Sequence, residues 1–242
     1  MKSAIWVGFD PRETAAFAVC RESIRRRLSG TVPINGLVLD SLKRQGLYWR
    51  PTERRLGRLW DVISQAPMAT EFAITRFLTP VIQGSGLAIF MDCDMLVRGN
   101  LQRVFNEIKD KRENKAVWCV KHVHVPSSDT KMDDQVQTTY GRKNWSSFMV
   151  FDCDHPGNKR LSIDLVNAAR GLDLHQFCWL KDEEIGELDP KWNYLVGHTE
   201  LPANVEPKVV HYTDGGPWFQ GFENVAYADE WRVEQTRWAS WL

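Results

Sequence analysis

The stretch GLAIFMDCDMLVRGN, residues 86–100, decides the fold of this chain. Its apolar run over 87–91 predicts a buried strand. Two carboxylates, Asp92 and Asp94, follow directly, and a helix-like pattern begins a few residues later. Parallel sheets bind ligands beyond the carboxyl ends of their strands, so this strand end is a candidate binding site.

Five further apolar runs are bounded by turn residues and predict strands: 4–9, 34–39, 116–120, 147–151 and 208–212. Helical patterns lie between or after these runs: 13–28, 70–78, 160–169 and 223–240. Thr70 is expected to cap the second helix, and Pro80 to disturb or end it. This alternation predicts an α/β fold, with a mixed, mainly parallel sheet flanked by helices. The 242 residues suit a single domain.

The composition limits the classes of function. The chain has 31 basic and 31 acidic residues, so we expect no nucleic acid partner, which would call for a basic excess. The N-terminal apolar run is too short for a signal peptide, and no run approaches a transmembrane segment. Five cysteines without a Cys-x-x-Cys spacing indicate reduced thiols rather than disulfides or a zinc site, and favour a cytoplasmic location.

Two segments stand apart from the alternating pattern. Residues 41–60, SLKRQGLYWRPTERRLGRLW, are predicted to form an irregular excursion or lid, whose basic side chains either hold phosphate or an acidic acceptor or are simply solvated. The C-terminal helix carries Trp231, Trp238 and Trp241. These favour packing on the parent domain or a dimer partner, and the alternative is shallow membrane contact near a lipid-linked acceptor.

The two carboxylates after the strand suit a metal–diphosphate site. Asp92 and Asp94 can face one divalent cation if Cys93 turns away, and Mg²⁺ or Mn²⁺ takes phosphate oxygens as its remaining ligands. The same tripeptide recurs as Asp152 and Asp154, but there it runs into HPGNKR, where aspartates serve as helix caps. We therefore assign the metal to the first pair.

Several stretches, in the same order, resemble motifs of family 8 glycosyltransferases. They are IWVGFDPRETAAFAV, ITRFLTP, LAIFMDCDMLVRGNLQRVF, RKNWSSFMVF, LDPKWNYL and KVVHYTDGGPWF. The resemblance implies a GT-A fold in one domain, with a nucleotide-binding half at 1–105 and a half at 106–242 that completes the acceptor and metal sites. It also implies a nucleotide-sugar donor (a UDP-sugar is favoured), Mn²⁺ or Mg²⁺, and transfer of a hexose with retention. The acceptor would be a glycan, a lipid-linked molecule or a small molecule, and a homo-oligomer is allowed.

The resemblance also assigns residues. Asp92, Asp94 and His211 would hold the metal, and Arg76 would contact the donor, unless it is only a structural ion-pair partner. Asp10 and Arg12 would lie beside the nucleoside, and Gly215 and Trp218 belong to the C-terminal donor motif.

The sequence departs from the family pattern at three places. Gly216 stands where the family has a lysine, so that Lys143, Arg142 or a basic residue of the 41–60 excursion would have to replace its charge. The family's asparagine-serine-glycine strand reads Trp145-Ser146-Ser147. The acidic segment near the reacting carbon is replaced by LHQFCWLKDEE, where Gln176 and Asp182 join Asp92 and Arg76 as catalytic candidates, with His175 and Glu183 beside them.

Three other classes compete with a transferase. The missing lysine favours a non-catalytic nucleotide-sugar-binding protein or a donor hydrolase of the same fold. A sugar nucleotidyltransferase would show a glycine-rich loop with a lysine after the first strand, which GFDPRETAAF lacks. A protein-interaction domain would not need these motifs in order.

Overall fold

The computed structural model describes residues 2–112, 114–123 and 142–240. Its central sheet has six strands in the order β10-β8-β9-β6-β1-β2. Their bounds are β1 Ser3–Gly8, β2 Ile34–Leu37, β6 Leu87–Met91, β8 Val117–Cys119, β9 Phe148–Asp152 and β10 Ile185–Glu187. Only β9 runs antiparallel to its neighbours. The mixed, mainly parallel sheet is therefore confirmed, and all six predicted runs form strands.

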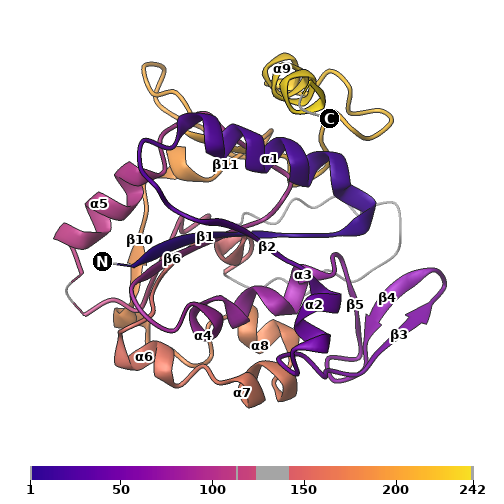
Figure 1. Cartoon of the computed structure of the whole chain (residues 1–242), viewed down its shortest axis with the longest axis vertical. Coiled ribbons are helices and arrows are strands. Elements are labelled where there is room, and N and C mark those ends of the chain that lie inside the picture. Colours follow the sequence, from indigo (N-terminus) through magenta and orange to yellow (C-terminus); the bar gives the residue numbers. More distant parts are fainter. Residues whose placement is uncertain (1, 113, 124–141, 241–242) are drawn as a thin grey trace.

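Helices cover both faces of this sheet (Figure 1). Their bounds are α1 Thr14–Arg27, α2 Leu39–Arg44, α3 Phe72–Thr75, α4 Thr79–Gln83, α5 Gln102–Asp110, α6 Pro156–Lys159, α7 Ile163–Ala168, α8 Gly171–His175 and α9 Ala228–Ala239. Figure 1 shows α1 on one face and α4 on the other, with α9 outside α1. Since β6 lies inside the sheet and between two helical layers, all five of its residues are buried.

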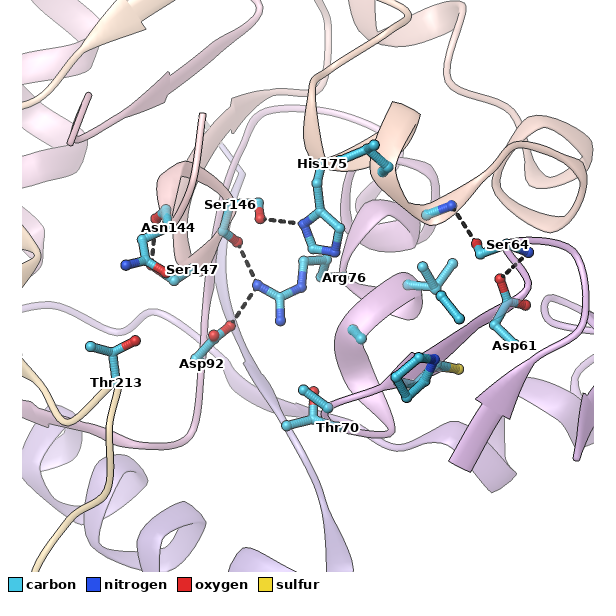
Figure 2. Close-up of a pocket in the computed structure, with 18 of the residues that line it drawn as sticks. Asp61, Ser64, Thr70, Arg76, Asp92, Asn144, Ser146, Ser147, His175 and Thr213 are labelled. Atoms are coloured by element: carbon cyan, nitrogen blue, oxygen red, sulfur yellow. Dashed lines mark hydrogen bonds and ion pairs between the residues drawn. The ribbon is translucent and has the colours of Figure 1, made fainter. Parts of the chain in front are cut away.

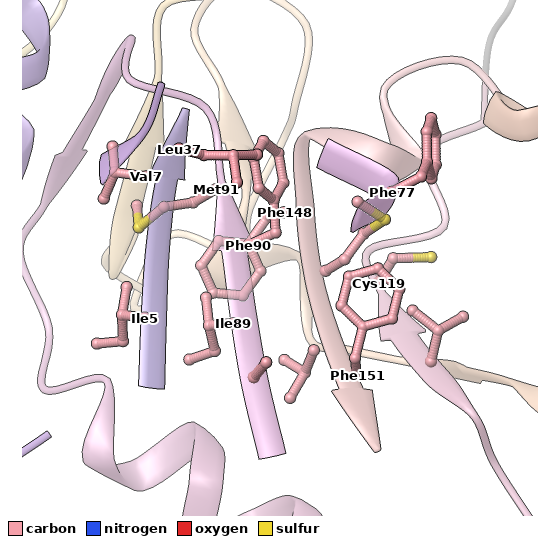
Figure 3. Packing of buried hydrophobic residues seen from close by; sticks show 14 of the residues in the cluster. Ile5, Val7, Leu37, Phe77, Ile89, Phe90, Met91, Cys119, Phe148 and Phe151 are labelled. Carbon is pink, nitrogen blue, oxygen red and sulfur yellow. The ribbon is translucent and has the colours of Figure 1, made fainter. Parts of the chain in front are cut away.

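The core lies on both sides of β6 (Figure 3). Ile5 and Val7 of β1, Phe90 of β6 and Phe151 of β9 are all fully buried. A fully buried large side chain contributes about 1.5–3 kcal/mol relative to its exposed state. This central core fixes where β6 ends and therefore where Asp92 lies.

The helix after Thr70 differs from the prediction. Glu71, not Thr70, is the N-cap of α3, and the buried Thr70 hydroxyl has no hydrogen-bond partner within the described part of the chain. A 3-10 turn, Arg76–Leu78, separates α3 from α4. Pro80 lies in the first turn of α4, where a backbone N–H has no intrahelical acceptor, so the N–H that proline lacks is not needed. Pro80 therefore disturbs the helical run without ending it.

The segment 41–60 is not irregular, so that prediction was wrong. It contains the end of α2 and strands β3 Thr52–Arg55 and β4 Arg58–Asp61, which form an antiparallel sheet with β5 Ala66–Met68. The fully buried Arg50 side chain binds Asp61 through two contacts of 2.6 Å and also donates to the carbonyls of Val166 and Ala169. This anchor ties the small sheet to α7.

A third sheet, in the order β11-β12-β7, joins the two halves of the chain. Its strands are β7 Met95–Val97, β11 Tyr194–Leu195 and β12 Val209–His211. Trp231 of α9 packs in a cluster with Leu96 of β7 and Val210 of β12. The buried Glu234 of the same helix pairs with Arg26 at 2.6 Å. Helix α9 therefore packs on the parent domain through Trp231; Trp241 lies outside the described residues.

In the part of the chain that the structure describes, no helix combines the length and the apolar character needed to cross a bilayer. All five cysteines are unpaired, and four of them are buried.

We expect Arg50→Ala to lower the free energy of unfolding by roughly 3–5 kcal/mol, because it leaves the Asp61 carboxylate buried without its partner. Arg54→Ala, at an exposed position in the same small sheet, should change it by less than about 0.5 kcal/mol. Urea unfolding followed by circular dichroism measures both values. Equal losses in the two variants would contradict the anchoring role of Arg50.

Candidate active site

A cavity of about 480 Å³ opens beyond the carboxyl end of β6 (Figure 2). Its walls come from the loop after β1, the β4–β5 connection, α3, the strand end at 92–94, the turn before β9, and α8. The polar and charged side chains in these walls are Glu13, Asp61, Ser64, Thr70, Arg76, Asp92, Asp94, Asn144, Ser146, Ser147, His175, His211 and Thr213. The binding site that the sequence predicted at this strand end therefore coincides with a cavity.

Strand pairing brings three metal-binding side chains together in this cavity. Asp92 follows β6 directly, and Asp94 immediately precedes β7. Met95 of β7 is the register partner of His211, the last residue of β12, and Tyr212 N donates to Asp94 O at 3.0 Å. As a result, one ligand atom from each of Asp92, Asp94 and His211 lies within 4.8 Å of the others.

A chain of buried hydrogen bonds orients the imidazole. Ser147 Oγ donates to the Asn144 carbonyl at 2.7 Å and accepts from Asn193 Nδ2 at 2.9 Å. The amide of Asn193 is thereby turned so that its Oδ1 faces His211 Nδ1 at 3.0 Å. Nδ1 must then carry the proton, which leaves Nε2 of the neutral ring directed at Asp94 Oδ1, 3.4 Å away. This is the tautomer that a metal ligand needs.

The electrostatics of the three side chains fit a cation. Burial raises the pKa of Asp92 to about 7, although Arg76 acts to lower it. Burial lowers the pKa of His211, but the carboxylates of Asp94 and Asp92 raise it by more, so the net change is upward. Among the residues that the structure describes, none donates a hydrogen bond to the buried Oδ1 atoms of Asp92 and Asp94. Two carboxylates and one imidazole form a hard, oxygen-rich ligand set that suits Mn²⁺ or Mg²⁺.

Arg76 is held against the same carboxylate. Its Nη1 lies 2.9 Å from Asp92 Oδ1 as an ion pair that is not aligned as a hydrogen bond, and it donates to the Ser146 carbonyl at 2.9 Å. Figure 2 shows the guanidinium between these two groups. The guanidinium carbon also lies 5.1 Å from the centre of the Phe90 ring. Arg76 is therefore both a structural ion-pair partner and a cation in the cavity wall.

Glu13 is a cavity carboxylate that the sequence analysis missed. It ends the 3-10 turn Pro11–Glu13 after β1, and burial raises its pKa to about 7, with a further contribution from Asp94. It stands three positions after Asp10 in the same strand-end loop. The strand-end argument that selects Asp10 therefore applies to Glu13 as well.

Asp10 and Arg12 bind each other. The buried Asp10 accepts from Arg12 at 2.7 and 2.9 Å and from Glu71 N at 3.0 Å. Burial raises the pKa of Asp10, but the hydrogen bonds from Arg12 and Glu71 lower it by more, to below its usual value. Neither residue is part of the described cavity lining. Their place beside a nucleoside stays a prediction.

The two catalytic candidates from the 174–184 segment are solvent-facing. Gln176 and Asp182 are exposed, and neither belongs to the described lining of the cavity. Arg142 binds both, through the Gln176 carbonyl and, at 2.5 Å, the Asp182 carboxylate. Their catalytic role stays a prediction, whereas the neighbouring His175 does line the cavity.

His175 is a neutral donor or acceptor in the cavity wall. Its Nδ1 lies 2.7 Å from Ser146 Oγ, and its ring meets the Phe77 ring edge-to-face at 5.2 Å. Burial lowers the pKa of His175 to about 3, and the nearby Arg76 contributes. The segment that carries an acidic residue in the resembled family therefore presents an uncharged imidazole here.

The C-terminal motif has a steric reason for its missing lysine. A Cβ atom at Gly216 would lie 2.0 Å from the Trp218 ring, so no side chain fits there in this arrangement. Trp218 packs against Tyr212 and Trp231, at ring distances of 5.7 and 5.4 Å. Gly215 and Trp218 lie outside the described cavity lining, whereas His211 and Thr213 of the same motif reach it. The donor-binding role of Gly215 and Trp218 stays a prediction.

The second aspartate pair is structural. Arg112 binds Asp152 through both carboxylate oxygens and also lies 3.3 Å from Asp154. Asp154 accepts from Gly86 N at 3.1 Å. The N-cap of α6 is His155, whose Nδ1 accepts from Gly157 N, so neither aspartate is the cap that the sequence suggested. The pair joins the chain before β6 to the end of β9.

Comparison with known proteins places this site in a recognised fold. No family model matches the sequence. Protein CDI of Arabidopsis thaliana is 44% identical over 234 residues, which cover 95% of this chain and 85% of that protein.

Three solved structures share the fold at low sequence identity. The bifunctional glycosyltransferase WbbM gives a TM-score of 0.62 at 14% identity, with 97% of this chain and 49% of that chain covered. The glycosyltransferase GlyE of Streptococcus pneumoniae gives 0.59 at 15%, with 99% and 62% covered. The galactosyltransferase LgtC, with donor and acceptor sugar analogues, gives 0.57 at 12%, with 97% and 95% covered. The chain thus has the GT-A glycosyltransferase fold, while it spans about half of the WbbM chain.

We expect Asn193→Ala to weaken Mn²⁺ binding about 10–100-fold, because the His211 ring would no longer be held in one orientation and one tautomer. Asn158→Ala is the matched control, since Asn158 is also buried but bonds the carbonyls of Ala116 and Asp152 away from the cavity. Calorimetric titration of Mn²⁺ measures both affinities. An unchanged affinity in the Asn193 variant, or an equal loss in the control, would contradict the orienting role.

His175 should make the free energy of unfolding depend on pH. Its folded pKa of about 3 lies below the ordinary value of 6.5, so the unfolded chain takes up a proton that the folded chain does not. Stability should therefore fall as the pH drops from about 6.5 towards 3, by about 1.4 kcal/mol per pH unit at most. His175→Phe should remove this part of the slope in urea unfolding, whereas His198→Phe, at an exposed position, should keep it. Parallel pH profiles for wild type and His175→Phe would refute the assignment.

Proposed function

The chain belongs to the family of Protein CDI, and we propose that it is a metal-dependent glycosyltransferase that moves a hexose from a nucleotide diphosphate sugar to a hydroxyl acceptor. The observation that carries the proposal is the set of Asp92, Asp94 and His211 in one cavity beyond β6. The GT-A fold supports it, because solved structures that share this fold are glycosyltransferases. We propose a UDP-sugar as the donor, and a glycan, a lipid-linked molecule or a small molecule as the acceptor.

Each residue of the site has a proposed task. A bound Mn²⁺ or Mg²⁺ would stabilise the charge that develops on the leaving diphosphate. Asp92 and Asp94 would bind that ion through Oδ1 atoms that accept no hydrogen bond from the described residues, and Asn193 holds His211 in the tautomer that would complete the set. Arg76 keeps the Asp92 carboxylate in place and adds a positive charge to the wall.

Retention by front-face attack is the mechanism that we propose. A protein nucleophile would need a carboxylate that is free to approach the reacting carbon. Asp61 is bound at both oxygens by Arg50, and Asp92 and Asp94 face the metal site. Of the carboxylates described in the cavity wall, this leaves Glu13 as the one candidate for a protein nucleophile. Glu13 itself lies close to Asp94 and Asp92 of the metal site. Mass spectrometry that finds a sugar covalently attached to the protein during turnover would overturn front-face attack.

One observation favours a second candidate, a donor hydrolase or a nucleotide-sugar-binding protein. Arg76 is the only lysine or arginine in the lining that the structure describes, and it is already paired with Asp92. A weak positive potential would slow departure of the diphosphate. Donor consumption that needs no acceptor would identify a hydrolase, and tight donor binding without consumption would identify a binding protein.

We expect UDP to bind measurably only with Mn²⁺ present, and Asp92→Asn/Asp94→Asn to abolish this dependence. Calorimetric titration of UDP and then GDP, with and without Mn²⁺, measures the effect and identifies the base. The matched control is Asp152→Asn/Asp154→Asn, which changes the same tripeptide at a site that Arg112 occupies. Metal-independent nucleotide binding in wild type, or loss of binding only in the control, would refute the site.

A further inference from the structure

A second cavity, of about 570 Å³, lies at the end of the paired strands β7 and β12 that is remote from the metal-binding side chains. Its walls come from the β7–α5 connection, α5, the 3-10 turn Pro190–Trp192 and the segment before β12. Figure 1 shows α5 across the molecule from the β3–β4 hairpin. The described linings of the two cavities share no residue. The volume suits a small ligand, since such sites usually measure about 300–1,000 Å³.

Three donor side chains in this second cavity have no acceptor in the described part of the chain. Trp192 is buried, and its Nε1 atom has no hydrogen-bond partner there. Arg103 of α5 and Lys208 before β12 form no ion pair with a described residue. Gly99 gives the Lys208 stem room to lie against the chain, because a Cβ atom at Gly99 would be 2.8 Å from Lys208 Cβ. Since a buried N–H without an acceptor is costly, these donors favour a ligand rich in acceptor atoms.

The N-terminus of α5 adds positive potential to the same wall. This helix begins at Gln102, and its first turn carries no acidic residue. Asn100, which belongs to the lining, accepts from Gln102 N at 3.0 Å through an uncharged side chain. No side-chain charge in that turn therefore opposes the positive end of the helix dipole, which favours an anion.

The other charged residues of the lining limit the charge of the ligand. Glu107, Glu206 and Lys191 are each paired with an oppositely charged residue outside the lining, at 2.7–3.0 Å. The unpaired charges that remain in the described lining are those of Arg103 and Lys208. A paired carboxylate still has lone pairs that accept from hydroxyl groups, but it repels a second anionic group. The combination favours a single phosphate group on a hydroxyl-rich molecule.

We propose that the second cavity binds a small sugar phosphate. Its phosphate would lie between Arg103, Lys208 and the N-terminus of α5, where charge-assisted hydrogen bonds and the helix dipole act together. Its hydroxyl groups would lie towards Glu107 and Glu206. These two carboxylates disfavour the larger negative charge of a nucleoside diphosphate, so the second cavity is not a second donor site. The proposal requires neither the metal nor the transfer reaction.

The test is calorimetric titration of glucose 6-phosphate, inorganic phosphate and glucose into the full chain, without metal or nucleotide. Glucose 6-phosphate should bind, inorganic phosphate should bind more weakly because it fills less of the cavity, and glucose should not bind measurably. Arg103→Gln/Lys208→Gln should weaken binding of glucose 6-phosphate about a hundredfold, since each hydrogen bond to a charged group contributes about tenfold or more. Trp192→Phe keeps an aromatic ring without the N–H donor and should weaken binding several-fold.

A matched control separates the site from general effects of charge. Lys43→Gln/Lys109→Gln makes the same charge change at exposed positions outside the second cavity, and it should leave the affinity unchanged. Circular dichroism checks that each variant is folded. If Trp192→Phe does not fold, the Arg103/Lys208 variant decides by itself. No binding of glucose 6-phosphate to wild type, equal affinity for glucose or for inorganic phosphate, or an equal loss in the control would overturn the proposal.

Discussion

The antiparallel pairing of Met95 with His211 is the contact on which the site depends. Asp94 precedes Met95 in the chain, so this one register places the imidazole beside the carboxylates. Side chains alternate along a strand, and a slip by one residue would turn His211 to the other face of its sheet. The bond from Tyr212 N to Asp94 O and the contact of Asn193 with His211 hold the register from two sides. Trp231 packs behind it, against Leu96 and Val210.

The same arrangement places three ionisable side chains where burial disfavours their charged forms. Asp92, Asp94 and His211 lie at the end of a sheet whose neighbouring strands are apolar, and burial disfavours the ionised carboxylates. Arg76 compensates in part, because its guanidinium lies against Asp92 and two aromatic rings. The pairing with arginine distinguishes this strand end from the Asp152–Asp154 turn, because Arg112 contacts both carboxylates there, whereas Arg76 contacts Asp92 here.

The β3–β5 sheet joins a buried ion pair to the wall of the cavity. Its base is fixed by Arg50 and Asp61, which no periodicity in the sequence indicates, because both side chains are polar and their partner on α7 is distant in the chain. Its last strand forms part of the cavity wall, and its turn exposes a leucine among arginines. One small sheet thus connects the interior site to the outer surface. Short charged strands lack a recognisable pattern, so the segment was predicted to be irregular.

The sequence by itself determined the strand at 87–91, the two carboxylates that end it and the mainly parallel sheet, because an apolar run and its boundary are local properties. Resemblance of motifs added His211 and Arg76 as their neighbours. Only the tertiary structure decided that Arg112 binds the second aspartate pair, that Glu13 and His175 line the cavity, and that Gln176 and Asp182 face solvent. These facts depend on contacts between residues far apart in the chain, and such contacts follow from packing rather than from any pattern within one segment.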